Sequence, residues 1–143
     1  MVDKPIVNNS LSVSPNLSGV RVVLVEVDYW VRESIHMMLS MWGCRVLFGG
    51  SILSVADAVR ETGFVPEIIL SDLRLTGQIG EDAVQVIPPL LQRDDIRCPV
   101  ILMTGDTDPG WPPLVKARAW KLLIKPFRPE ELYVTMVDAL RFV

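Results

Sequence analysis

The sequence predicts an α/β fold in which helices cover both faces of a five-stranded parallel sheet. Five short apolar runs recur along the chain, and each is nearly continuous and mostly aliphatic. Runs of this kind are typical of strands that are buried on both faces. The segments between them carry apolar residues at helical spacing, and no hairpin turn joins one run to the next. Strands and helices that alternate in this way form a doubly wound sheet with right-handed crossovers.

The five expected strands cover residues 22–25, 45–48, 68–70, 100–103 and 122–124. Between the first two, a helix is predicted by apolar residues at helical spacing, namely Ile35, Met38, Leu39 and Trp42. Gly43 follows directly and is expected to end this helix, because glycine readily adopts the left-handed conformation found after a last helical turn.

The second and third expected helices follow the second and third strands. Val55 and Val59 belong to the second helix, which is expected to end at Gly63. The third helix is expected to begin at Glu81 and to extend through residue 87. The adjacent Pro88 and Pro89 should kink or break it, because proline removes a helical hydrogen bond and clashes with the preceding turn.

The fourth and fifth expected helices both begin with proline, which is tolerated in a first helical turn. Pro112 and Pro113 open a short fourth helix that extends to about Trp120. Pro129 opens the fifth. Its apolar stripe consists of Leu132, Met136, Val137 and Leu140.

Length and composition indicate one folded domain. The chain has 143 residues, of which 50% are hydrophobic and 22% are charged, as in ordinary globular domains. We expect a domain over residues 20–143, preceded by a flexible leader over residues 1–19, which is rich in Asn and Ser. The apolar residues within that leader leave a second interpretation open, that of an ordered docking arm.

Charge and hydropathy exclude several classes of partner. Lys and Arg number 14 against 17 Asp and Glu, for a net charge of -3, so the chain lacks the basic surface that contacts nucleic acid. No apolar run is long enough to cross a membrane, and the first residues do not form a signal peptide. We therefore expect a cytoplasmic protein. Its two cysteines, Cys44 and Cys98, lack metal-ligand spacing and are expected to be packing thiols.

The residues that follow the expected strands are chemically distinctive. Glu26 and Asp28 follow the first strand, Asp72 the third, Thr104 the fourth and Lys125 the fifth. In open α/β sheets, ligands bind outside the carboxyl ends of the strands, where the strand order reverses. A carboxylate attacks a phosphoryl group only where negative charge is offset, which calls for a divalent cation, an ammonium group and a hydroxyl. This edge of the sheet contains candidates for each role.

Three segments resemble the receiver domains of bacterial two-component response regulators. They are residues 66–75, residues 100–105 and the triplet Lys125-Pro126-Phe127, and the resemblance extends from about residue 21 to residue 143. It implies a flavodoxin-like sheet with strand order 2-1-3-4-5 and five helices. It also implies that a sensor histidine kinase or a phosphotransfer protein donates a phosphoryl group, that a downstream protein partner reads the result, and that a homodimer is one form of assembly.

The resemblance assigns roles to individual residues. Asp72 corresponds to the phosphoacceptor, Thr104 to the hydroxyl that binds phosphoryl oxygens, and Lys125 to the ammonium that pairs with the phosphorylated carboxylate. The backbone carbonyl of Arg74 corresponds to a magnesium ligand, and Mg²⁺ is also expected to contact Glu26 and Asp72. The peptide bond before Pro126 is typically cis in this family.

Two positions depart from the family pattern. Val27 stands where a second acid usually binds the metal, and because Val offers no oxygen ligand from its side chain, magnesium affinity should fall. Asp28 either compensates as a metal ligand or caps the first helix, and both interpretations remain open. Leu122 stands where the family usually has a Tyr or Phe whose ring rotates with the state of the hydroxyl residue. Trp120 is a candidate substitute for that ring.

Two functions follow from these observations. The first is a receiver that is phosphorylated on Asp72 and signals by a change of conformation. The second is a pseudo-receiver, in which Val27 has disabled the chemistry and the fold acts only as a protein-docking module. A flavin or nucleotide enzyme is disfavoured, because no glycine-rich phosphate loop follows the first strand.

Overall fold

The fold is described by a computed structural model over residues 17–75, 82–105 and 120–141. Five parallel strands form one sheet in the order β2-β1-β3-β4-β5, which confirms the predicted sheet. The strands are β1 (Arg21–Val25), β2 (Arg45–Gly49), β3 (Ile68–Asp72), β4 (Val100–Thr104) and β5 (Lys121–Ile124). The helices are α1 (Tyr29–Met41), α2 (Ile52–Thr62), α3 (Ala83–Arg93) and α5 (Pro129–Arg141).

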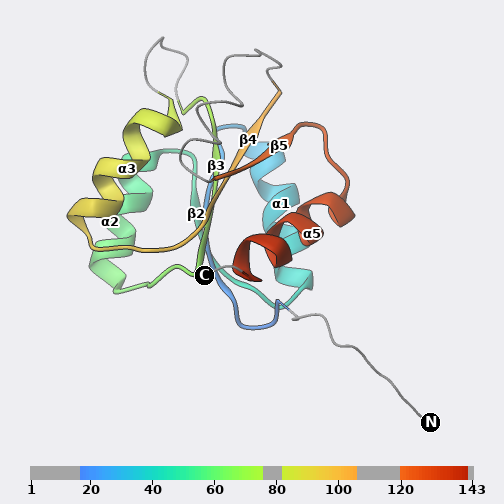
Figure 1. Cartoon of the computed structure of the whole chain (residues 1–143), viewed down its shortest axis with the longest axis horizontal. Helices are drawn as coiled ribbons and strands as arrows, with labels where there is room; N and C mark the ends of the chain where they lie inside the picture. Colours follow the sequence, from blue (N-terminus) through green and yellow to red (C-terminus); the bar gives the residue numbers. More distant parts are fainter. Residues whose placement is uncertain (1–16, 76–81, 106–119, 142–143) are drawn as a thin grey trace.

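The helices lie in two layers, one on each face of the sheet. Figure 1 shows α2 and α3 on one side of the strands and α1 and α5 on the other. The core is divided accordingly. Along β1, Val22 and Leu24 pack toward α1 and α5, whereas Val23 and Val25 pack toward α2 and α3. Successive side chains of a strand point to opposite faces, and a strand covered on both sides is therefore apolar at each position.

Local sequence signals fix the first two helices. The Asp28 carboxylate caps α1 by accepting a hydrogen bond from the Val31 amide at 3.0 Å. Gly43 follows α1 with φ at 84°, and Gly63 follows α2 with φ at 70°. Both glycines adopt the left-handed conformation that side chains disfavour. The predicted ends of these two helices are confirmed.

The third helix corrects one expectation. α3 continues through Pro88 and Pro89 to Arg93, so the prolines do not break it, and the alternative of a kink stays a prediction. The Asp82 carboxylate caps the helix by accepting from the Gln85 amide at 3.1 Å. The buried face of Ala83, Val84 and Ile87 packs on the sheet. Burial of this face outweighs the low helix propensity of proline, because tertiary packing routinely overrides propensity.

The described residues contain four helices, against the five expected. The predicted fourth helix, from Pro112 to about Trp120, falls almost entirely outside the described residues. Most of the expected leader also falls outside them, but its last three residues belong to the folded domain. Leu17 is buried in the core, and the Gly19 amide donates to the Gly43 carbonyl at 2.8 Å.

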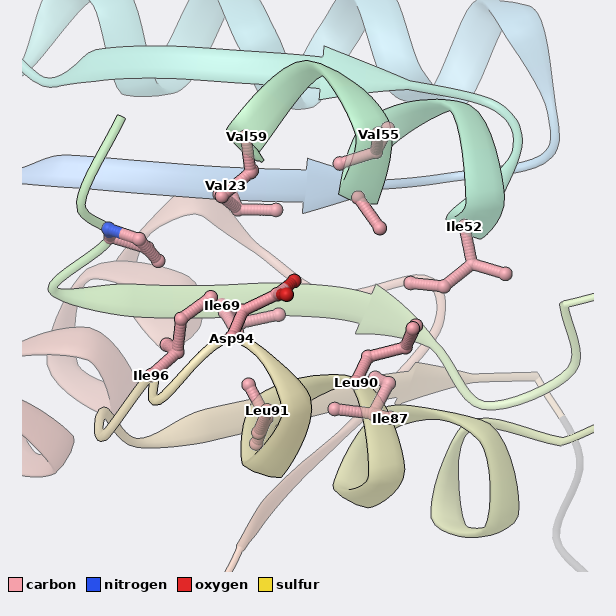
Figure 2. A pocket seen from close by; sticks show the side chains of 12 residues that line it. Val23, Ile52, Val55, Val59, Ile69, Ile87, Leu90, Leu91, Asp94 and Ile96 are labelled. Carbon is pink, nitrogen blue, oxygen red and sulfur yellow. The ribbon is translucent and has the colours of Figure 1, made fainter. Parts of the chain in front are cut away.

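A small cavity lies between α2 and α3, above β1 and β3. It measures about 40 Å³ and is lined mainly by aliphatic side chains. Figure 2 shows Val55 and Val59 from α2 facing Ile87 and Leu91 from α3 across this space. Asp94, at the end of α3, is the one acidic group among its lining residues, and it pairs with Arg93 through two hydrogen bonds of 3.0 and 3.1 Å.

The two cysteines pack against the two core clusters, as the sequence predicts. Cys44 and Cys98 are half-buried and form no disulfide. Burial raises the pKa of the Cys44 thiol to about 11 and that of the Cys98 thiol to about 12, so both stay protonated and unreactive near neutral pH. No helix in the described segments has the length and apolar character needed to span a membrane.

Candidate functional site

The carboxyl edge of the sheet brings together three predicted site residues. Asp72 is the last residue of β3, Glu26 follows β1 and Lys125 follows β5. The Lys125 ammonium donates to Asp72 Oδ1 at 2.6 Å and to Glu26 Oε1 at 2.5 Å. The three strands thus place two carboxylates around a single ammonium group.

Burial makes this cluster electrostatically strong. The Glu26 side chain is 1% exposed, that of Asp72 is 7% exposed and that of Lys125 is 25% exposed. Burial and the neighbouring Asp72 raise the pKa of Glu26 from 4.5 to about 7, although Lys125 opposes this shift. Burial by itself lowers the pKa of Lys125, but its bonds to Asp72 and Glu26 outweigh that effect and the net shift is upward. Lys125 therefore stays charged near neutral pH.

Backbone amides of the β1–α1 loop complete the hydrogen bonding of the two acids. The Val27 amide donates to Asp72 Oδ2 at 2.8 Å, and the Asp28 amide donates to Glu26 Oε2 at 3.0 Å. Together with Lys125, these amides give every oxygen of both carboxylates a donor. The Val27 side chain is 48% exposed, so this residue serves the site through its backbone.

Asp28 occupies the position that the sequence left open between two roles. Its carboxylate caps α1 through the Val31 amide, which is the second of the two interpretations. Its contact with the site is through its backbone amide, which donates to Glu26. A role for the Asp28 carboxylate as a metal ligand remains a prediction.

An open hollow lies beside Asp72. It measures about 390 Å³, and its lining includes Asp72, Arg74, Thr104 and Lys125. Thr104 ends β4 and is 6% exposed, and the Lys125 amide donates to its carbonyl at 2.7 Å. Arg74 is exposed and pairs with Asp82 in an isolated antiparallel bridge. The predicted hydroxyl and carbonyl positions thus border the same space as the predicted phosphoacceptor.

Two further features bear on the resemblance to receiver domains, the Lys125-Pro126 peptide bond and the departure at Leu122. The peptide bond between Lys125 and Pro126 is cis, as the resemblance implies. Leu122 pairs with Leu102 of β4 and packs with Trp120 against the core cluster beneath α2 and α3. Trp120 is therefore a half-buried packing residue, and its role as a substitute reporter remains a prediction.

The oxygen donors near Asp72 form a minimal set of ligands for Mg²⁺. No group of three or more His, Cys, Asp or Glu in the described residues is arranged to hold a metal ion. Two carboxylates, Glu26 and Asp72, remain, together with the Arg74 carbonyl. Because Mg²⁺ often binds one or two carboxylates and keeps several waters, these groups fit it as a minimal set. The Lys125 ammonium between the carboxylates competes with the cation for them.

Sequence reasoning missed two groups of the site. The first is the Val27 amide, since no side-chain pattern identifies a backbone donor. The second is Arg32, whose Nη1 donates to the Glu26 carbonyl at 2.8 Å. Arg32 lies four residues after the cap residue Asp28, which places it one helical turn into α1. That spacing is the only signal that could have indicated it.

Comparison with known proteins supports the fold but does not test the roles of the site residues. No protein-family profile and no curated protein sequence matches this chain. Among solved structures, chemotaxis protein CheY4 of Vibrio cholerae is 19% identical with a TM-score of 0.71, over 85% of this chain and 99% of that one. The fold is that of a response-regulator receiver domain. A receiver domain protein from Clostridium thermocellum is 15% identical with a TM-score of 0.72, over 86% of this chain and 95% of that one.

A longer protein shares the receiver fold. The response regulator PhyR from Brucella abortus is 23% identical with a TM-score of 0.68, and the match covers 89% of this chain and 50% of PhyR. In the sheet of this chain the strand order reverses between β1 and β3, which is where ligands bind in such folds. Glu26 and Asp72 flank that point, so the candidate site lies at the switch point of the sheet.

Proposed function

We propose that this chain is a signalling receiver in which Asp72 accepts a phosphoryl group. The phosphoryl donor is a phosphohistidine on a sensor histidine kinase or a phosphotransfer protein. One observation supports this proposal most directly. The Asp72 carboxylate is held by Lys125 on one oxygen and by the Val27 amide on the other, and it borders the open hollow beside Thr104.

The transfer is a displacement at phosphorus. An Asp72 oxygen forms a bond to phosphorus while the bond from phosphorus to the donor imidazole nitrogen breaks. The electron pair of that bond stays on the imidazole, which takes up a proton from solvent, and Asp72 becomes an acyl phosphate. Lys125, already 2.6 Å from Asp72 Oδ1, and the Thr104 hydroxyl then donate to the phosphoryl oxygens. Glu26, Asp72 and the Arg74 carbonyl would hold Mg²⁺, whose charge offsets that of the transferring group.

A hollow beside the site suits the phosphodonor protein. It lies between α1 and the β5–α5 loop, measures about 520 Å³, and is lined by Trp30, Met38 and Phe127 among others. Trp30 is 77% exposed, and exposed tryptophans are enriched where proteins dock. Lys125 borders this hollow as well as the one beside Asp72, so a protein seated on α1 would lie next to the phosphoacceptor.

Intact-protein mass spectrometry after incubation with Mg²⁺ and phosphoramidate tests the proposal. The parent protein should gain one phosphoryl mass, and Asp72→Asn should gain none. Asp95→Asn is a matched control, because the Asp95 side chain is 86% exposed and lies outside the site. No gain by the folded parent, with phosphoramidate and with a phosphorylated phosphotransfer protein, would refute the proposal.

The second candidate function is a docking module that is not phosphorylated. Two observations favour it. Val27 stands in place of an acid, and Lys125 with two backbone amides already donates to every oxygen of Glu26 and Asp72, so no metal ion is needed to satisfy them. Beryllofluoride, which mimics a phosphoryl group on a carboxylate, separates the two functions. A rise in unfolding temperature with Mg²⁺ and beryllofluoride, absent in Asp72→Asn, would support the receiver. Equal unfolding temperatures with and without the mimic would support the docking module.

A further inference from the structure

The peptide group between Glu26 and Val27 lies between two charged side chains. Its carbonyl oxygen accepts from Arg32 Nη1 at 2.8 Å, and its amide donates to Asp72 Oδ2 at 2.8 Å. The carbonyl and the N–H of a trans peptide point in opposite directions. A guanidinium and a carboxylate therefore hold the two ends of one peptide group.

We propose that Arg32 is a positioning residue that orients Asp72 through this peptide. As a statement about phosphoryl transfer, the inference rests on the function proposed above. As a statement about geometry, it stands on the two hydrogen bonds alone. Arg32 bonds to the Glu26 carbonyl, whereas Asp72 accepts from the Val27 amide. Its effect is transmitted by the peptide that carries the Val27 amide.

The surroundings of Arg32 restrict its guanidinium to this position. Its central carbon lies 5.5 Å from the centre of the Tyr29 ring, a distance typical of a cation–π contact. On another side lies Gly50, where an added Cβ would come within 2.7 Å of Arg32 Nη1. The absence of a side chain at position 50 thus leaves room for the guanidinium to reach the Glu26 carbonyl.

The chain of bonds has a physical consequence for Asp72. Hydrogen bonds to charged groups are roughly twice as strong as neutral ones, and bonds in a chain polarise one another. With Lys125 on Oδ1 and the Val27 amide on Oδ2, both oxygens of Asp72 have fixed directions. Without the guanidinium, the 26–27 peptide loses the bond on its carbonyl side, and the alignment of its amide with Asp72 Oδ2 weakens. Small misplacements of a reacting group have large effects on rate.

Val27 and Arg32 contribute different groups to the orientation of Asp72. Position 27 contributes only an amide, so Val27→Ala should leave the bond to Asp72 intact. Position 32 contributes a planar, charged donor, so Arg32→Met, which keeps an unbranched apolar stem, should release it. Gly50→Ala should have the same effect as Arg32→Met, because it displaces the guanidinium while the charge stays in the protein.

The direct test is nuclear magnetic resonance of the Val27 amide in the full chain, without phosphorylation. In Arg32→Met and Gly50→Ala, the Val27 amide proton should shift upfield and its hydrogen exchange should become roughly tenfold faster, as expected for loss of a charge-assisted bond. In Val27→Ala, the amide of residue 27 should stay protected from hydrogen exchange, as in the parent. Arg97→Met is the matched control, because the Arg97 side chain is 90% exposed. A parent-like Val27 amide in folded Arg32→Met and Gly50→Ala would overturn the inference.

A second measurement connects the geometry to reactivity. The rate of phosphoryl transfer from phosphoramidate should fall roughly tenfold in Arg32→Met and Gly50→Ala and should not change in Arg97→Met. If the parent is phosphorylated and Arg32→Met reacts at the same rate, the positioning role is refuted while the proposed function stands. A parent that takes up no phosphoryl group would refute the proposed function, and the Val27 amide would still decide whether Arg32 orients Asp72.

Discussion

Replacing Glu26 by Gln removes the most deeply buried carboxyl group of the site. The Glu26 side chain is 1% exposed, and its pKa is raised from 4.5 to about 7 by burial and by Asp72. A carboxyl group whose pKa is higher in the folded chain binds its proton more tightly there than in the unfolded chain. Its contribution to stability is therefore fully present below pH 4.5 and is lost as the pH rises to about 7.

The magnitude follows from the size of the shift. One proton changes the free energy of unfolding by about 1.4 kcal/mol per pH unit. Over the interval from 4.5 to about 7, this amounts to roughly 3 kcal/mol. Glu26 is coupled to Asp72 and Lys125, so roughly 3 kcal/mol is the upper limit for the contribution of Glu26 itself. The amide of Gln does not titrate, so Glu26→Gln should lack this part of the pH dependence.

Urea unfolding of the parent and of Glu26→Gln at about pH 5 and about pH 8 measures this difference. A chelator keeps divalent cations away from the site. Titrating groups outside the site affect both proteins equally, so the difference between their pH dependences reports on Glu26 together with its coupled neighbours Asp72 and Lys125. Glu130→Gln, an exposed position at the start of α5, serves as the control and should behave like the parent. The same loss of stability with pH in the parent and in Glu26→Gln would refute the reasoning.

Three further predictions concern single positions. Asp28→Ala should destabilise the protein by about 1 kcal/mol, because α1 loses its cap. In a magnesium titration of the same variant, an affinity equal to that of the parent would eliminate Asp28 as a compensating ligand. Val27→Asp should bind Mg²⁺ roughly tenfold more tightly by calorimetry, because it adds an oxygen ligand where the receiver domains that this sequence resembles bind the metal. An unchanged affinity would contradict this. Val59→Ile should raise the free energy of unfolding by up to about 1 kcal/mol by filling the cavity of about 40 Å³ in Figure 2, whereas a loss of stability would show that the added methyl does not fit.

The sheet could be predicted from sequence because its signals are local and repetitive. The central strands β3 and β4 are buried at every position, and they are apolar up to Leu70 and Met103 before the polar residues Ser71, Asp72 and Thr104 end them. The glycines that end α1 and α2 could be predicted for a similar reason, since a left-handed residue after a helix favours glycine whatever packs around it.

The points that sequence reasoning missed depend on tertiary contacts. α3 stays helical through Pro88 and Pro89 because Ala83, Val84 and Ile87 are buried. Their burial depends on the sheet beneath the helix. Leu17 belongs to the core although the residues around it are polar. The sequence identified Glu26, Asp72 and Lys125 by their places at strand ends. It did not indicate the bond from Arg32 to the Glu26 carbonyl, because the room for that bond depends on Gly50 in a different loop.

The charge balance of the site explains how the fold accommodates Val27. An acid at this position would place a third carboxylate beside Glu26 and Asp72, which already share the ammonium of Lys125. Like charges in a buried site disfavour ionisation, and the pKa of Glu26 is already raised. With Val27, the two carboxylates are satisfied by one ammonium and two amides. Val27→Asp should therefore gain affinity for Mg²⁺ and lose stability in its absence, because the cation becomes the group that balances the third negative charge.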